Sequence, residues 1–140
     1  MTKLHIGTLA LASALALPAQ AQTEVQWWHS MGGALGEWVN DLAKDFNASQ
    51  KDYKIVPTFK GSYDESMTAA IAAFRAGNAP HILQVFEVGT ATMMASKNAI
   101  VPVGEVMKKA GVTFDPNAYV PAVAGYYTAP NGQMLSFPFN

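Results

Sequence analysis

Residues 53–87, YKIVPTFKGSYDESMTAAIAAFRAGNAPHILQVFE, decide the fold class, because an extended segment, a helix and a second extended segment follow one another closely. Segment 53–60 is rich in residues that favour strands. Its Pro57 cannot donate to a ladder and predicts an edge strand or a bulge. A helix is predicted from Asp64, a suitable N-cap. The mostly apolar run 81–86 predicts a buried strand.

The same alternation continues on both sides of this stretch. A first strand is predicted over 25–28, and a helix ending at Asn47 follows it, with apolar residues at helical spacing, namely Leu35, Trp38, Val39, Leu42 and Phe46. Further predictions are a helix over 91–95 capped by Thr90, a short helix over 103–110, and a hairpin whose strands, 126–128 and 134–136, flank Asn131-Gly132. Strands that alternate with helices indicate an α/β fold with a mostly parallel sheet flanked by helices.

Length and charge limit the classes of function. The chain has 140 residues, ten acidic and nine basic side chains, and a net charge of −1. This balance gives no electrostatic footprint for nucleic acid or anionic membranes, so no nucleic-acid partner is predicted. Residues 22–140 suffice for one domain with one core, and not for two. With no cysteine, this domain must fold by packing alone.

The first 21 residues have the pattern of a secretory signal peptide. Lys3 gives a basic start, 6–17 are apolar and uncharged, and Pro18-Ala19-Gln20-Ala21 predicts cleavage after Ala21. A helix of the apolar run would rise only ~18 Å, too short for a hydrocarbon core of ~30 Å. Because no cysteine is present to carry a lipid anchor, we expect a free protein in a bacterial periplasm.

Signatures of enzymes are absent from the sequence. It contains no G-x-S-x-G, H-E-x-x-H, P-loop or G-x-G-x-x-G motif. Beyond the signal only His29 and His81 remain, and a zinc site would need carboxylates as their partners. For both we favour a hydrogen-bonded structural role. We therefore predict no enzymatic activity, no catalytic residues, no metal site and no cofactor.

Two polar side chains stand where ligands bind in open α/β sheets, beyond the carboxyl ends of the strands. Tyr63 lies in the loop after strand 53–60, and Glu87 directly follows strand 81–86. A tyrosine hydroxyl can donate to a phosphate oxygen, whereas an ionised glutamate can only accept, which suits ligand hydroxyls. The alternatives stay open at this stage: a surface tyrosine, and a glutamate that complements a helix dipole.

The pair Trp27-Trp28 offers apolar surface near the same edge. Adjacent residues of a strand point to opposite faces. One indole is therefore expected in the core, while the other is a candidate wall of a ligand cleft.

Five stretches of the chain resemble extracellular solute-binding proteins of ABC importers. They are Trp28-His29-Ser30-Met31, residues 53–57 with Lys60-Gly61, residues 72–75 with 77–80, residues 82–96, and residues 135–140. The run 82–96, ILQVFEVGTATMMAS, is the most specific, and it resembles the periplasmic members of that family that bind sn-glycerol-3-phosphate. The resemblance extends over essentially the whole chain, signal included.

The resemblance implies a type II periplasmic binding protein, with two α/β lobes joined by a hinge that close over the ligand. It implies that Tyr63 and Glu87 contact sn-glycerol-3-phosphate, with glycerophosphodiesters as further ligands. The partners it implies are the permease subunits of an ABC importer with a cytoplasmic ATPase. Other ligand contacts of the family, its cationic group included, lie beyond this sequence. Residues 22–140 are therefore expected to form an incomplete N-terminal lobe.

Two other functions remain open at this stage. A sugar or oligosaccharide receptor would share the fold, with Trp27 or Trp28 stacking on sugar rings. An exported phosphoesterase would need metal ligands or an activated nucleophile, and the sequence offers neither constellation.

Overall fold

The computed structural model describes residues 22–96, 98–113 and 115–139. In chain order the elements are β1 (Thr23–His29), α1 (Gly33–Ser49), β2 (Tyr53–Phe59), α2 (Tyr63–Arg75), β3 (Ile82–Leu83), α3 (Glu87–Ala95), α4 (Val103–Lys109), the 3-10 helix η1 (Pro116–Ala118) and α5 (Pro121–Tyr126). The predicted signal peptide, residues 1–21, lies outside the described residues. None of the helices in these ranges is both long and apolar enough to cross a membrane.

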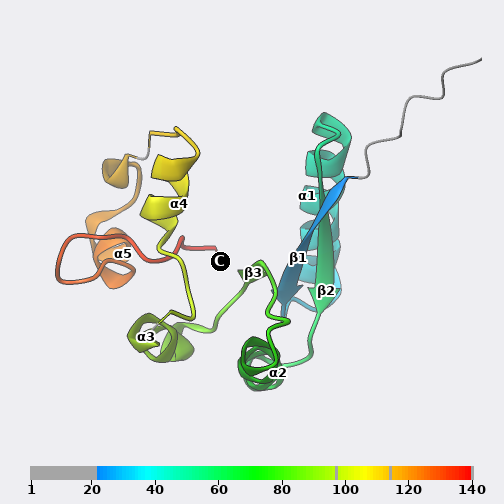
Figure 1. Cartoon of the computed structure of the whole chain (residues 1–140), viewed down its shortest axis with the longest axis horizontal. Coiled ribbons are helices and arrows are strands. Elements are labelled where there is room, and N and C mark those ends of the chain that lie inside the picture. Colours follow the sequence, from blue (N-terminus) through cyan, green and yellow to red (C-terminus); the bar gives the residue numbers. More distant parts are fainter. Residues whose placement is uncertain (1–21, 97, 114, 140) are drawn as a thin grey trace, which may run out of the picture.

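The sheet has three parallel strands in the order β2-β1-β3. The helix α1 packs against β2, and Figure 1 shows α1 and α2 beside the sheet. The predicted α/β class with a parallel sheet flanked by helices is confirmed. The prediction that Pro57 marks an edge strand is also confirmed, since β2 pairs with β1 alone among the described strands.

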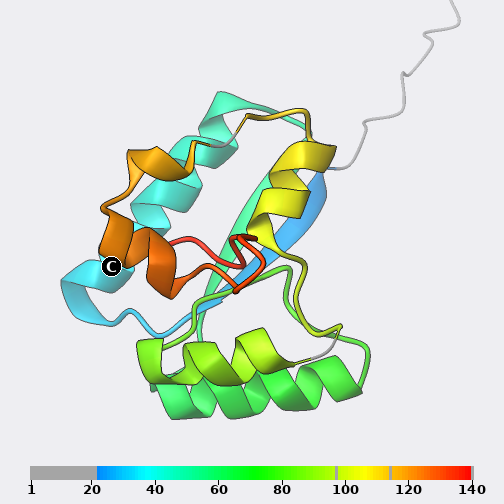
Figure 2. The ribbon, with the colours of Figure 1, turned by 90° about the vertical axis from the view of Figure 1, so that its left-hand side faces the viewer.

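The helices α3, α4 and α5 gather on the side of the sheet away from α1, as Figures 1 and 2 show. The last described residues return from this group to the sheet. The ring of Phe139 stacks on Trp38 of α1 with centroids 5.3 Å apart, and it forms a T-shaped pair with Trp27 of β1 with centroids 5.5 Å apart. Three aromatic rings from distant parts of the chain thus hold the C-terminal segment against the sheet.

The start of α2 differs from the sequence prediction, because Ser62 and not Asp64 is its N-cap. The Glu65 N–H donates to Ser62 Oγ at 3.3 Å, and the Ser62 N–H donates to Glu65 Oε2 at 2.7 Å. This capping box satisfies two backbone donors and also lowers the pKa of the Glu65 carboxyl, through the bonds from Ser62. Gly61 makes the preceding turn at φ +80°.

The end of α1 was also predicted wrongly, because the helix continues past Asn47 to Ser49. Asn47 does not stop the helix, since its side chain bonds the neighbouring strand. Its Oδ1 accepts from the Ile55 N–H at 2.7 Å, and its Nδ2 donates to the Ile55 carbonyl at 2.9 Å. The amide thereby fixes α1 against β2.

The run 81–86 forms a much shorter strand than predicted, with only Ile82–Leu83 in the ladder and Ile82 43% exposed. On the side away from β1, β3 pairs with no other strand within the described residues. The next helix begins at Glu87, so Thr90 lies inside it and is not its cap, as the sequence had predicted. The chain therefore turns from strand to helix within four residues.

The C-terminal turn is confirmed, but the two predicted hairpin strands are not. Gly132 has φ +81° in the turn, and one isolated antiparallel bridge joins Thr128 to Met134. The first strand of the hairpin was predicted to begin at Tyr126, but Tyr126 is the last residue of α5. That helix begins at Pro121. Proline is pre-organised for the first turn of a helix, a signal that the sequence prediction had not used.

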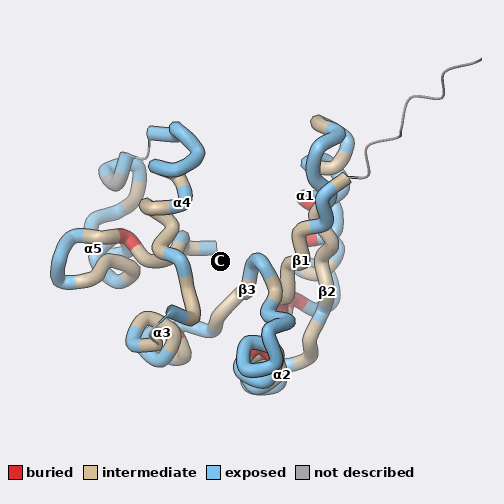
Figure 3. Tube along the Cα trace, in the orientation of Figure 1, coloured by how far each residue is buried: buried red, intermediate tan, exposed pale blue. Residues whose placement is uncertain are grey.

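The described core is small, as the few buried segments in Figure 3 indicate. Its buried apolar residues are Met31, Val39, Ala43, Ala70 and Met134. Of the predicted apolar face of α1 only Val39 is buried, whereas Leu35, Trp38, Leu42 and Phe46 remain 40–51% exposed. A three-stranded sheet covers only the narrow stripe of α1 around Val39 and Ala43.

Candidate functional site

The candidate site lies at the carboxyl ends of the three strands, which parallel pairing brings to one edge of the sheet. The Lys60 N–H donates to the His29 carbonyl at 2.9 Å, and the Gln84 N–H donates to the Trp28 carbonyl at 2.9 Å. The Gln84 side chain accepts from the Ser30 N–H at 3.0 Å. These bonds fix the segments that leave β1, β2 and β3 beside one another.

Tyr63 lies at this edge, but as the first residue of α2 and not in a loop. Its ring stacks on that of Phe86, with centroids 4.9 Å apart and planes 20° from parallel. Phe86 directly precedes Glu87, so the stacking places Tyr63 beside the start of α3. The structure thereby brings the two predicted site residues to the same part of the sheet edge.

Glu87 is exposed and is the first residue of α3. Its carbonyl accepts from the Tyr126 hydroxyl at 2.7 Å, a contact between residues 39 apart in the chain. Tyr126 ends α5, so this helix holds the start of α3 in place. The Glu87 carboxylate stands at a helix N-terminus, where the helix dipole favours negative charge, and the residue is exposed.

Gly89 of α3 lies next to the end of the Met67 side chain from α2. A Cβ added at Gly89 would lie 2.7 Å from Met67 Cε and 3.3 Å from Val85 Cγ1. The helix that starts with Glu87 and the helix that starts with Tyr63 thus meet at Gly89 through the Met67 side chain.

Neither tryptophan is fully buried, so the expectation of one core indole is wrong. Trp27 packs against Phe139, and the Lys60 Nζ lies 3.8 Å from the centroid of a Trp28 ring. Both indoles thus have a partner within the chain, which leaves less surface for stacking on a sugar than the sequence suggested.

Both histidines have the structural role predicted from the sequence. The His29 Nδ1 accepts from the Met31 N–H at 3.3 Å, and the His81 Nδ1 accepts from the Gln26 N–H at 3.0 Å. His29 is 3% exposed, and desolvation lowers its pKa from the ordinary 6.5. Within the described ranges no group of three potential metal-ligating side chains is found.

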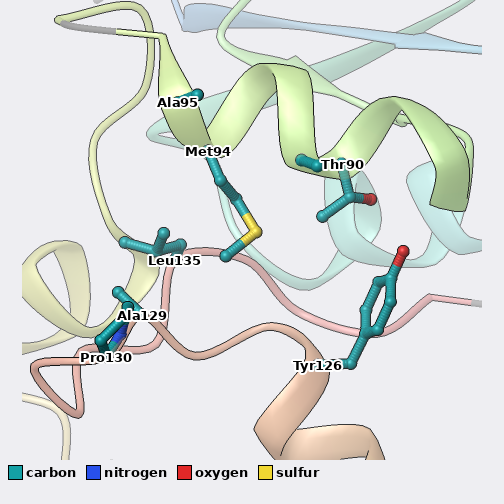
Figure 4. A pocket seen from close by; sticks show the side chains of 8 residues that line it. Thr90, Met94, Ala95, Tyr126, Ala129, Pro130 and Leu135 are labelled. Carbon is teal, nitrogen blue, oxygen red and sulfur yellow. The ribbon is translucent and has the colours of Figure 1, made fainter.

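A hollow of about 430 Å³ lies between α3 and the C-terminal part of the chain. Figure 4 shows Met94 pointing into it from α3, opposite Leu135 and Tyr126. Its mostly apolar lining is Thr90, Ala91, Met94, Ala95, Tyr126, Ala129, Pro130 and Leu135. Neither Tyr63 nor Glu87 lines this hollow, so it is not the predicted site.

Comparison with known proteins identifies the family. The model of the family "Bacterial extracellular solute-binding protein" matches residues 32–140, which include both predicted site residues. The chain belongs to this family. It is 58% identical over its whole length to the sn-glycerol-3-phosphate-binding periplasmic protein UgpB of Escherichia coli (strain K12), covering 32% of that protein. The protein of the same name from Rhizobium meliloti (strain 1021) is 52% identical over 93% of the chain, which covers 30% of the relative.

This extracellular solute-binding protein thus spans about a third of the length of the curated relatives it matches. Sequence reasoning proposed Tyr63 and Glu87 as site residues but missed the residues that contact them, Phe86 and Tyr126. Phe86 was read as part of an apolar strand, and nothing in its spacing indicates a ring partner. Tyr126 carries no sequence signal at all, because its contact with Glu87 depends on how α5 packs.

Proposed function

We propose that this chain is part of a periplasmic receptor that captures sn-glycerol-3-phosphate and delivers it to the permease of an ABC importer. The observation that carries the proposal is the 58% identity, over the full chain, to a protein named for binding this ligand. The meeting of Tyr63 and Glu87 at one sheet edge, through the Tyr63–Phe86 stack, supports it.

The two side chains have complementary roles in this proposal. The Tyr63 hydroxyl donates to a phosphate oxygen without adding a charge of its own. The exposed Glu87 carboxylate accepts from the two hydroxyls of the glycerol moiety and repels a ligand that enters with its phosphate reversed. Capture then orients the ligand without any chemical step, so the protein is a binding component and not an enzyme.

The proposal includes the architecture around this site. Residues 22–140 form the N-terminal α/β lobe, incomplete in this sequence, and a second lobe closes over the ligand. The half-exposed apolar side chains of α1, namely Leu35, Trp38, Leu42 and Phe46, support a larger protein, because such a surface is normally covered. Residues 1–21 direct export to the periplasm, where the receptor meets the permease and its cytoplasmic ATPase.

Titration calorimetry tests this proposal on the complete receptor, meaning this chain together with the further length that its relatives have. Saturable binding of sn-glycerol-3-phosphate is expected, without binding of maltose and without release of inorganic phosphate. Maltose binding with no binding of the phosphate ester would refute the assignment of the ligand. Release of phosphate would refute the assignment as a binding protein.

Site variants test the roles of the two residues. Glu87→Ala and Tyr63→Phe each remove a hydrogen bond to a charged group, which is worth ~1.5–3 kcal/mol. Each variant should therefore weaken binding by about tenfold or more. The matched controls are Glu37→Ala, on exposed α1, and Tyr53→Phe, at the opposite end of β2, and both should bind as the parent does. Parental affinity in both site variants would contradict the site.

A further inference from the structure

A lysine at the sheet edge is held in place without a carboxylate. Lys60 directly follows β2, and its N–H donates to the His29 carbonyl at 2.9 Å, which fixes its backbone. Its side chain is half-buried and places the Nζ 3.8 Å from the centroid of a Trp28 ring. A cation over an indole face is attracted by the ring quadrupole, so Trp28 restrains the ammonium group.

Within the described residues, no carboxylate forms an ion pair with this ammonium group. The ion pairs within the described residues join Lys54 to Glu24 and Lys109 to Glu105. In that part of the chain the Lys60 ammonium has neither an ion pair nor a hydrogen bond, and an indole face offers no acceptor. A restrained cation therefore keeps its three N–H donors for a ligand or water.

The position of Lys60 relates this cation to the candidate site. Lys60 and Tyr63 stand on either side of the turn Gly61-Ser62, and three residues of chain span at most ~11 Å. Trp28, Thr58 and Lys60 share one face of the sheet, because side chains alternate along strands and Trp28 pairs with Thr58. The Lys60 backbone therefore lies within ~11 Å of the Tyr63 backbone, and the ammonium group lies over Trp28 on that face of the sheet.

We propose that Lys60, held on Trp28, makes this edge of the sheet selective for an anionic ligand by attracting its phosphate group toward Tyr63. The inference rests on the proposed function and adds a residue that the predicted site did not include. Lys60 acts at a distance through its charge, whereas Tyr63 donates the hydrogen bond. Trp28 has the role of a platform that keeps the ammonium beside the site.

The test compares charge-removing and charge-conserving variants of the complete receptor. Lys60→Met keeps the stem on Trp28 and removes the charge, whereas Lys60→Arg keeps both the charge and the ring contact. Lys51→Met is the matched control, because Lys51 is exposed in the turn before β2. The seven residues of β2 separate it from Lys60 by roughly 20 Å or more.

Affinity for sn-glycerol-3-phosphate is measured by calorimetry in about 0.01 M and about 1 M NaCl, where the Debye lengths are ~30 Å and ~3 Å. Unit charges ~10 Å apart at an effective dielectric constant between ~20 and ~80 predict a loss of about twofold to sixteenfold for Lys60→Met at low salt. This loss should disappear at high salt. Lys60→Arg and Lys51→Met should match the parent at both salt concentrations.

Three results would overturn the inference: a Lys60→Met receptor with parental affinity, an equal loss in Lys51→Met, or a loss that high salt does not diminish. The second would indicate an effect of net charge, and the third a structural role for the side chain. If Lys60→Met fails to fold, Lys60→Gln takes its place. A parent that binds no sn-glycerol-3-phosphate refutes the proposed function itself, whereas a binding parent with an unaffected Lys60→Met refutes only this inference.

Discussion

Replacing Ser62 by alanine removes one half of the capping box that begins α2. The Ser62 Oγ accepts from the Glu65 N–H at 3.3 Å, and alanine leaves that backbone donor without its partner. The second half remains, because the Ser62 backbone N–H still donates to Glu65 Oε2. The change therefore isolates the contribution of one side-chain hydrogen bond to the helix that begins with Tyr63.

The expected loss follows from the geometry of this bond. Replacing a serine N-cap by alanine destabilises a protein by ~0.5–2 kcal/mol. The bond is long and Ser62 is exposed, so we expect a loss of about 1 kcal/mol, roughly a fivefold change in the folding equilibrium. Ser62→Thr keeps an acceptor and should lose a few tenths of this amount.

Urea denaturation of the complete receptor measures the loss, and hydrogen exchange at the Glu65 amide locates it in the first turn of α2. The control is Thr68→Ala in the middle of the same helix, where Thr68 is exposed. Alanine is the better helix former, so this variant should be as stable as the parent or slightly more stable. A Ser62→Ala variant as stable as Thr68→Ala would refute the role of the capping box.

Two further predictions concern a buried histidine and a tyrosine hydroxyl. Burial lowers the pKa of His29, so between 6.5 and this lowered pKa the unfolded chain binds more protons than the folded chain. The free energy of unfolding should therefore fall as the pH drops from 6.5 through the lowered pKa. In His29→Gln this part of the pH dependence of urea midpoints should vanish, and an unchanged profile would contradict it. Tyr126→Phe removes the bond to the Glu87 carbonyl and should cost ~0.5–1.5 kcal/mol in urea denaturation. Tyr127→Phe, the neighbouring control, should cost less, and equal losses would argue against this bond.

The order of the elements could be predicted from the sequence because the signals are local. A run of β-forming residues, a helical spacing of apolar residues and a glycine after the last turn each act within a few neighbours along the chain. The error at the start of α2 was of the same local kind. The residues S-x-x-E at 62–65 form a capping box, and the prediction chose the acidic Asp64 instead.

Burial could not be predicted in the same way. The helical spacing that selected Leu35, Trp38, Leu42 and Phe46 gives the apolar side of α1 but not what covers it, and these side chains are 40–51% exposed here. The run 81–86 is apolar enough for a buried strand, yet only two residues pair with β1. Strand length and burial depend on neighbours that distant segments supply.

The sequence by itself determined the α/β alternation and the family, and it placed Tyr63 and Glu87 after strands whose ends could meet. Only the tertiary structure decided that the two residues are joined through Phe86, that Tyr126 holds the start of α3, and that Lys60 lies on Trp28. The physical reason is sequence separation: a contact between residues 23 to 39 positions apart, or between neighbouring strands, exists only once the sheet and helices have packed.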